Sequence, residues 1–306
     1  MRIVSLLPSA TEMVYALGAG HQIVGISHEC DFPEAARRHQ VLTRARISTS
    51  ESSAAIDGAV RGVIGEALSL YAVDEARLAA LAPDLIVTQD LCQVCAVSLD
   101  DVRSAVARLS SHDSVNIVSL SPTRLAHVFD DVETVARALG RVAEGQRLRG
   151  ALEARVRAIA ERAQAATTRP RVVSIEWLAP IMLGGTWMPE LIALAGGIAA
   201  GARAGEPAPT LSVEALSNLD ADVVLVKPCG FDIARTLRER SLIEQSLLPA
   251  FGPNTRVVVS DGNAFFNRPG PRLVESLEIL AACVHPQLFP DFAEKHAREL
   301  FALTSA

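Results

Sequence analysis

Two stretches of this sequence carry the same pattern, LAALAPDLIVTQDLC at residues 78–92 and LSNLDADVVLVKPC at residues 216–229. Three positions of the first stretch recur 138 residues later: Leu78, Leu81 and Asp84 become Leu216, Leu219 and Asp222. In both stretches a short helical pattern ends and a run of apolar residues typical of a buried strand begins. The repeat predicts two related α/β units, although chance similarity between two such segments is a competing interpretation.

The beginnings of the two halves also match in pattern. MRIVSLLPSATEMVYALGAG (1–20) and RPRVVSIEWLAPIMLGGTWMPELIALAGG (169–197) each contain a basic residue, a strand-like run, a loop and a helix that ends in glycines. Strand and helix patterns alternate in both halves, which predicts an α/β protein with two Rossmann-like lobes, each built on a mostly parallel sheet. Residues 48–72 interrupt the first half, and we expect a partly helical flap there.

A different pattern fills residues 124–166, which are dense in Ala, Arg, Glu and Leu at helical spacing and contain no proline. We expect a long helix within residues 122–169, either a single helix or two nearly coaxial ones. Gly140, Gly145 and Gly150 weaken this helix without stopping it. The helix is predicted to join an N-terminal lobe (1–121) to a C-terminal lobe (170–306).

Composition excludes several classes of function. The 306 residues carry a net charge of −6, so there is no basic surface of the kind that binds nucleic acid. No stretch approaches the ~18 apolar residues that a membrane-spanning helix needs. Pro8, Thr11 and Glu12 interrupt the apolar start where a signal peptide would continue, so the sequence by itself predicts a cytoplasmic protein, which we expect to be a monomer. The odd number of cysteines, five, favours reduced thiols.

Residues with useful chemistry gather where the predicted strands end. In open parallel sheets, ligands bind beyond the carboxyl ends of the strands. If the two lobes face each other, these loops line a single cleft. The predicted ligand-binding residues are Ser9, His28, Glu29, Cys30, Cys92, Cys95, Glu176, Trp177, Trp187, Cys229, Phe231, Asn267 and Arg268.

Cys92 and Cys95 are spaced so that both thiols can face one metal ion. They can equally be small buried hydrophobic residues. A redox pair fits less well, because the following helix is expected to start near Ser98, beyond both thiols. The candidate metal site, for cobalt, zinc or iron, consists of His28, Cys30, Cys92, Cys95 and Cys229. Cys283 lies in an apolar helix and is predicted to be a core residue.

Several of these residues have a structural alternative. The loop that contains His28 can be a polar turn before Pro33 rather than a source of an axial metal ligand. Trp177 and Trp187 can anchor the core, but the prolines and glycines around them favour loop positions that present a flat face to a ligand. Arg268 either caps a helix or contacts an amide, carboxylate or phosphate. No pattern for a catalytic triad, a Walker loop or a zinc protease occurs, so an enzyme is not predicted.

Five segments carry a resemblance to a known family: RIVSLLPSATEMVYALGAGHQIVGIS (2–27) with CDFP (30–33), LAALAPDLIVT (78–88), LIALAGG (191–197) and LSVEALSNLDADVVLV (211–226). They resemble the solute-binding proteins of ABC importers in the cobalamin and iron-siderophore class, most nearly the cobalamin binders. The resemblance implies two α/β lobes bridged by a backbone helix and non-catalytic binding of cobalamin, another corrinoid or a related metal chelate in the interlobe cleft. It also implies an ABC permease as partner and a periplasmic location, with no obligatory cofactor.

The resemblance extends to individual residues. In the family, one exposed glutamate on each lobe docks onto the permease; Glu214 matches the second, whereas the first falls near Asp100 or Asp101. Glu29 and Ala208 replace aromatic residues that pack on the corrin ring, and Trp177, Trp187 and Phe231 are candidate substitutes. The cysteines have no counterpart in the family. A cytoplasmic corrinoid or metal carrier and a thiol- or zinc-dependent enzyme remain alternative functions.

Overall fold

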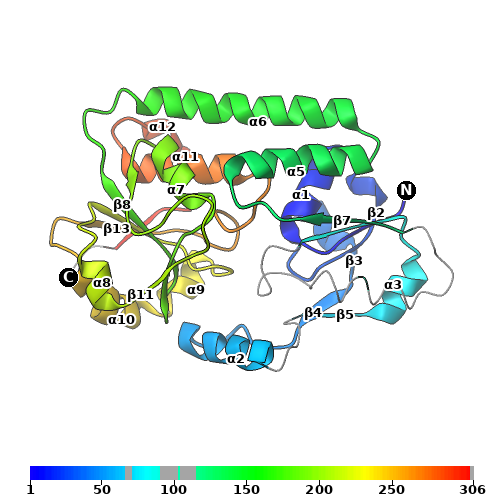
Figure 1. The fold of residues 1–306 in the computed structure, drawn as a ribbon, viewed down its shortest axis with the longest axis horizontal. Helices are drawn as coiled ribbons and strands as arrows, with labels where there is room; N and C mark the ends of the chain where they lie inside the picture. Colours follow the sequence, from blue (N-terminus) through cyan, green and yellow to red (C-terminus); the bar gives the residue numbers. More distant parts are fainter. Residues whose placement is uncertain (66–70, 90–102, 104–114, 304–306) are drawn as a thin grey trace. The chain divides into compact units, whose positions relative to one another are not determined.

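The computed structural model describes residues 1–65, 71–89, 103 and 115–303, and the chain divides into two compact units (Figure 1). Unit 1 contains residues 1–51, 55–122 and 126–151, and unit 2 contains residues 52–54, 123–125 and 152–306. The predicted lobe limits at residues 121 and 170 stay a prediction. Within the described chain, no helix combines the length and apolar character that crossing a bilayer requires.

Unit 1 contains a five-stranded sheet in the order β3-β2-β1-β6-β7, and all of its strands are parallel. β1 and β6 are buried along their whole length, as expected for strands of a parallel sheet that is covered on both faces. Four strands predicted from apolar runs are confirmed, in β1, β2, β6 and β7. The strands are β1 (Ile3–Ser5), β2 (Ile23–Ile26), β3 (Gln40–Val41), β6 (Leu85–Gln89) and β7 (Asn116–Leu120).

The helices of unit 1 cover this sheet. Leu78 of α3 (Glu75–Leu81) is fully buried in an apolar cluster with residues of β1 and β6. Figure 1 shows α1 (Pro8–Ala16) on the other side of the sheet. The segment predicted as a partly helical flap forms helix α2 (Ser53–Gly65), which lies in the chain between the antiparallel strands β4 (Thr43–Ala45) and β5 (Tyr71–Val73).

The long connecting helix is confirmed as α6 (Val142–Ala163), whose first part belongs to unit 1 and whose second part belongs to unit 2. The prediction of one continuous helix or of two nearly coaxial ones is wrong. Residues 122–169 hold two helices, α5 (Leu125–Ala138) and α6, and within unit 1 the second folds back along the first rather than continuing it (Figure 1). The physical reason is Gly140, whose φ of +68° lies in the left-handed region that ends helices. Arg149 of α6 then reaches Asp130 of α5 at 2.7 Å.

Unit 2 contains a seven-stranded sheet in the order β11-β9-β8-β12-β13-β14, with β10 also paired to β8. Its centre is parallel, and its antiparallel pairings involve β9, β11 and β14. The mostly parallel sheets predicted for the two lobes are therefore confirmed. The strands are β8 (Arg171–Trp177), β9 (Ile181–Leu183), β10 (Ile198–Ala199), β11 (Thr210–Leu211), β12 (Val223–Val226), β13 (Arg256–Val259) and β14 (Phe301–Leu303).

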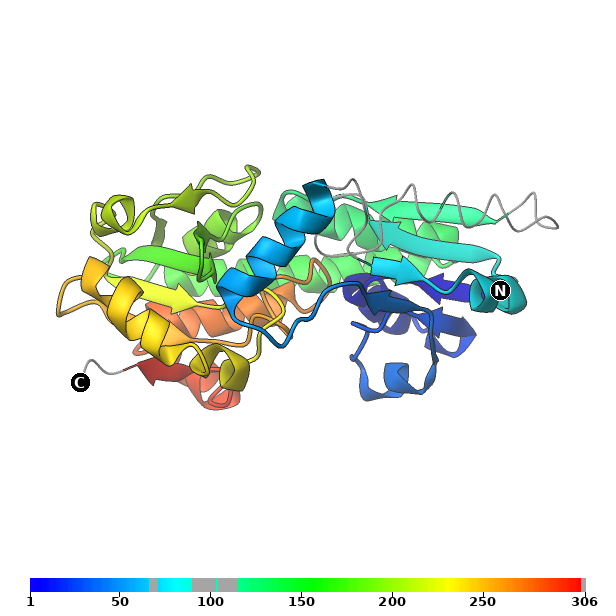
Figure 2. The same cartoon turned by 90° about the horizontal axis from the view of Figure 1, so that it is seen from below.

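Helices cover both faces of this second sheet (Figures 1 and 2). One face packs against α8 and α9 in an apolar cluster that includes Leu216 and Leu237. α7, α11 and α12 lie on the other face, where Cys283 of α11 is buried as predicted. The helices are α7 (Met188–Leu194), α8 (Val213–Ser217), α9 (Ile233–Leu237), α10 (Arg240–Leu242), α11 (Leu273–Val284) and α12 (Pro290–Lys295), with short π and 3₁₀ turns at Ile243–Leu247 and Leu248–Ala250. In unit 1, short 3₁₀ turns lie at Gly20–Gln22 and Glu34–Arg38.

The two units repeat the same local contacts, which supports the repeat found in the sequence. Asp84 accepts a hydrogen bond from the backbone N–H of Arg2 at 2.7 Å, and Asp222 accepts one from the backbone N–H of Arg171 at 2.7 Å. In both cases the aspartate precedes a central strand and ties it to the start of the neighbouring strand. The 138-residue offset therefore relates equivalent positions of the two units.

Candidate functional site

The carboxyl ends of β8, β12 and β13 meet at one edge of the unit 2 sheet, and the loops that follow them are joined by backbone hydrogen bonds. Cys229 N–H donates to Glu176 O at 2.9 Å, and Gly262 N–H donates to Phe231 O at 2.9 Å. At Gly262 a Cβ atom would lie 2.1 Å from Pro228 O, so only glycine allows these loops to approach so closely. The predicted residues of unit 2 that follow these strands therefore share one rigid edge.

A buried lysine lies at the centre of this edge. The side chain of Lys227 is fully buried, and its Nζ lies 2.9 Å from Glu176 Oε2 and 2.7 Å from Asn267 Oδ1. Asn267 is fixed in turn, because its Nδ2 donates to Gly262 O at 2.8 Å. Glu176 and Asn267 are among the predicted ligand-binding residues, whereas Lys227 is not. The available signal was a lysine directly after the all-apolar strand β12, at the edge where ligands bind.

Aromatic side chains lie beside this ion pair. The ring centroids of Trp177 and Phe231 are 5.2 Å apart, and the guanidinium of Arg235 lies 4.0 Å above the Phe231 ring. Arg235 also pairs with Glu239 at 3.2 Å, so its charge is compensated. Trp177 is half-buried, and its indole N–H donates to Ala179 O. Because this polar atom is already paired, the part of Trp177 that a ligand can contact is the apolar ring.

The last loop of this edge holds Arg268, which is buried and donates through Nη2 to Asn263 Oδ1 at 3.0 Å. Asp261 organises the same loop by accepting the backbone N–H groups of Asn263 and Ala264 at 2.9 and 2.7 Å. Burial raises the pKa of Asp261, although these two hydrogen bonds oppose the shift. Arg268 thus has a structural partner within its own loop.

Trp187 does not share the position of Trp177. It precedes α7, is 5 % exposed, and its indole N–H donates to Phe266 O at 2.8 Å. The prolines and glycines around Trp187 predict a loop residue that presents a flat face to a ligand. The structure instead gives Trp187 the features of a core anchor, because its ring is covered and its polar atom is already paired.

In unit 1, Ser9 and Cys30 lie deep in the structure. Ser9 is buried in the first turn of α1, and its Oγ has no hydrogen-bond partner among the described residues. Cys30 is 3 % exposed, and its sulfur accepts a hydrogen bond from Thr11 Oγ1 at 3.0 Å and lies 3.9 Å from Ser5 O. The Cys30 thiol is therefore turned into the protein.

His28 and Glu29 lie nearer the surface. His28 Nδ1 is 2.7 Å from Thr43 Oγ1, and its ring centroid is 5.2 Å from that of Tyr71. His28 Nε2 lies 3.3 Å from Glu29 Oε1. Both side chains are partly exposed, unlike that of Cys30, although the Nε2 atom of His28 is itself buried.

The candidate metal site is not assembled in the part of the chain that the structure describes. There, no three His, Cys, Asp or Glu side chains come close enough together to hold a metal ion. Cys92 and Cys95 lie outside the described residues, Cys30 faces inward, and Cys229 belongs to unit 2. Metal ligation by these residues stays a prediction.

For the docking acids, the structure describes Glu214, which is exposed in the first turn of α8, whereas Asp100 and Asp101 lie outside the described residues. The repeat offers another candidate in unit 1. Asp74 and Ser212, 138 positions apart, both cap their helices. Each side chain accepts a hydrogen bond from the backbone N–H of the residue three positions later. Position 214 then corresponds to position 76, an exposed alanine that follows exposed Glu75.

The two α/β units and their strand-end loops define a two-lobed solute-binding protein. The chain belongs to the periplasmic binding protein family, whose model matches residues 3–250. A comparison with curated protein sequences finds no match.

Solved structures share the fold at low sequence identity. A periplasmic heme-binding protein from Pseudomonas aeruginosa has a TM-score of 0.67 at 19 % identity, over 99 % of this chain and 95 % of that one. The heme-binding protein RhuT from Roseiflexus sp. RS-1 has a TM-score of 0.66 at 24 % identity, over 95 % and 98 %. The vitamin B12 binding protein BtuF of Vibrio cholerae has a TM-score of 0.66 at 18 % identity, over 93 % and 98 %.

Proposed function

We propose that this protein is the substrate-binding component of an ABC importer and that it binds a corrinoid such as cobalamin, or a related metal chelate, without chemical turnover. Membership of the periplasmic binding protein family supports the importer role. The similar structures include binders of vitamin B12 and of heme, and both ligands are flat metal chelates.

The observation that carries the proposal is the half-buried ring of Trp177 at the carboxyl edge of the unit 2 sheet, which packs on the buried ring of Phe231. Aromatic rings contribute a large apolar contact at little conformational cost, and they suit a ligand with a broad organic surface. Glu176, which precedes Trp177 in β8, is partly exposed and can accept a hydrogen bond that fixes the ligand's orientation. A flat chelate with polar groups on its rim matches this combination.

Titration with cyanocobalamin, hemin and a ferric siderophore tests the proposal. The sequence contains only two tryptophans, so their fluorescence reports on Trp177 at the edge and Trp187 in the core. We expect saturable quenching by at least one chelate, and we expect most of it to disappear in Trp177→Phe. Trp187→Phe is the matched control, because it removes the hydrogen bond to Phe266 O yet should leave ligand affinity unchanged.

Absence of saturable binding to every chelate would rule the proposal out. Recovery of the bound chelate in chemically unchanged form is the result expected of binding without turnover, whereas conversion of the ligand would favour an enzyme. Because importer components of this family work in the periplasm, cell fractionation of the native protein provides a second test.

A further inference from the structure

Lys227 is among the largest fully buried side chains of the described residues, and it lies at the edge of the unit 2 sheet rather than in the apolar core. Burying an ammonium group costs several kcal/mol unless a charged partner and hydrogen bonds compensate. Glu176 and Asn267 supply this compensation at 2.9 and 2.7 Å. The lysine is therefore a fixed part of the edge, held in place by its partners.

Exposure separates the two members of the ion pair. The Lys227 side chain is 0 % exposed, whereas that of Glu176 is 28 % exposed. Asn267 reinforces the arrangement, because its Nδ2 donates to Gly262 O and to Lys227 O, and this directs its Oδ1 at the ammonium group. A ligand at this edge can therefore meet the carboxylate of Glu176 but cannot reach the donors of Lys227.

We propose that the Glu176–Lys227 pair selects chelates whose rim carries neutral hydrogen-bond donors, such as carboxamides, over chelates whose rim carries carboxylates. This inference rests on the proposed function. A carboxylate that a buried ammonium neutralises offers an acceptor without a strong net charge, so a carboxamide N–H can donate to it. An ionised carboxylate has no proton to donate and would meet another anionic oxygen. In this arrangement Glu176 contacts the ligand and Lys227 is a positioning residue.

The other cations of the edge do not offset this preference. Arg235 is paired with Glu239 at 3.2 Å and lies over the Phe231 ring. Arg268 is buried and donates to Asn263. Both guanidinium groups are thus engaged by protein partners. The carboxylate of Asp261 at the same edge accepts two backbone N–H groups of its own loop, so we assign the selectivity to Glu176.

A charge cycle tests the inference. The wild-type pair has a net charge of zero, Glu176→Gln changes it to +1, Lys227→Met changes it to −1, and the double variant restores zero. Dissociation constants are measured for cyanocobalamin, whose rim carries carboxamides, and for hemin, whose rim carries two carboxylates. Circular dichroism and thermal unfolding of each variant show whether it is folded, and the double variant avoids leaving a buried charge unpaired.

We expect wild-type protein to prefer cyanocobalamin. In Glu176→Gln, affinity for hemin relative to cyanocobalamin should rise by about tenfold, in keeping with one hydrogen bond to a partly exposed charged group. The affinity for hemin relative to cyanocobalamin should fall in Lys227→Met and return toward the wild-type value in the double variant. A wild-type preference for hemin, or a ratio that moves in neither single variant, would overturn the inference and leave the proposed function standing. Wild-type protein that binds no chelate would overturn both.

Discussion

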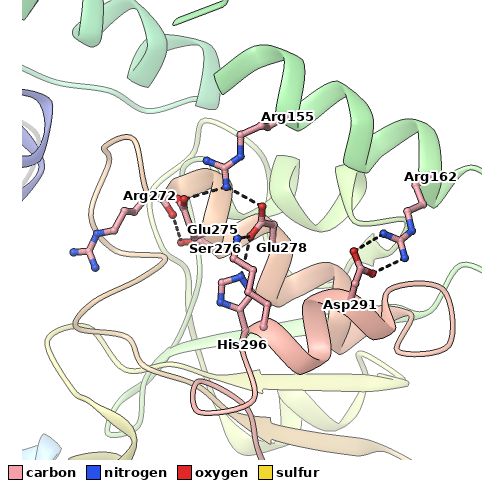
Figure 3. A network of polar contacts seen from close by, with 9 residues as sticks. Arg155, Arg162, Arg272, Glu275, Ser276, Glu278, Asp291 and His296 are labelled. Carbon is pink, nitrogen blue, oxygen red and sulfur yellow. Dashed lines mark hydrogen bonds and ion pairs between the residues drawn. The ribbon is translucent and has the colours of Figure 1, made fainter. Parts of the chain in front are cut away.

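Glu278 Oε2 lies 2.9 Å from His296 Nε2, and both side chains are 6 % exposed (Figure 3). The same carboxylate accepts hydrogen bonds from Lys295 at 2.6 Å and, through Oε1, from Arg155 of α6 at 2.8 Å. One carboxylate therefore joins α6, α11 and α12 within unit 2. Arg162 adds a second ion pair between α6 and Asp291.

This network predicts a stability that depends on pH. Burial alone would raise the pKa of Glu278, but hydrogen bonds from His296, Lys295 and Arg155 outweigh it and lower the pKa to about 2. Because the folded-state pKa lies below the ordinary value of 4.5, the stabilisation is present above pH 4.5 and is lost as the pH falls toward 2. The shift corresponds to on the order of 3 kcal/mol.

Glu278→Gln should reduce the free energy of unfolding by about 2 kcal/mol at pH 7, since it removes charged hydrogen bonds from a buried site. It should also flatten the decline of stability between pH 4.5 and pH 2. Urea unfolding across this range measures both effects. Asp291→Asn is the matched control on an exposed pair and should cost less than 1 kcal/mol. Equal costs for the two substitutions would contradict the role assigned to Glu278.

The sequence could predict the repeated α/β units because their signal is local. Buried strands such as β6 and β12 are uniform apolar runs, and Asp84 and Asp222 mark their starts. The fold-back of α5 and α6 was missed because it depends on the backbone conformation of one residue. Gly140 sits in a sequence whose composition favours helix throughout, and helical propensity does not reveal a φ of +68°.

The candidate site was predictable by position but not by orientation. Strand ends located Glu176, Trp177 and Phe231 correctly at one edge of unit 2, because parallel strands align their carboxyl ends. Which side chains turn inward depends on tertiary packing, so Cys30, Trp187 and Phe231 were not distinguished from exposed residues. Lys227 was not predicted as a site residue, because lysine is rarely fully buried.

Permease docking should depend on acids at equivalent positions of the two units. Glu214→Lys and Glu75→Lys should each reduce uptake of the chelate by cells, since both replace an exposed acid in the first turn of equivalent helices with a base. Ligand affinity of the purified variants should be unchanged. Glu294→Lys, at another exposed acid, is the control. Normal uptake by the Glu214→Lys and Glu75→Lys variants would argue against docking through these helices.

Thiol reactivity should differ among the cysteines that the structure describes. Burial raises the pKa of Cys283 to about 12, so its reactive thiolate is scarce at pH 8. Cys30 is buried, whereas Cys229 is only partly covered. Iodoacetamide should therefore label Cys229 before Cys30 and Cys283 in native protein, as peptide mapping by mass spectrometry would show. In unfolded protein, the cysteines should be labelled at similar rates. Early labelling of Cys283 in the native state would be inconsistent with its burial.

The predicted metal site depends on Cys92 and Cys95. If they ligate zinc or cobalt, the double substitution Cys92→Ser/Cys95→Ser should abolish binding of these ions in a calorimetric titration, because hydroxyls are poor ligands for borderline metals. Cys283→Ser controls for loss of a buried thiol. Metal affinity that survives the double substitution would leave these two cysteines as structural residues.

Two glycines of α6 test whether α5 and α6 pack side by side. A Cβ atom on Gly145 would lie 2.4 Å from the Cβ of Ala136 in α5, whereas a Cβ atom on Gly150 would meet nothing within 4 Å. Gly145→Ala should therefore lower the free energy of unfolding by about 1–3 kcal/mol through overpacking. Gly150→Ala should raise it by about 0.5–1 kcal/mol, because alanine loses less backbone freedom in a helix. Thermal unfolding of the two variants measures this difference in sign. Had the helices continued coaxially, neither site would face a neighbouring helix, and both substitutions would stabilise the protein.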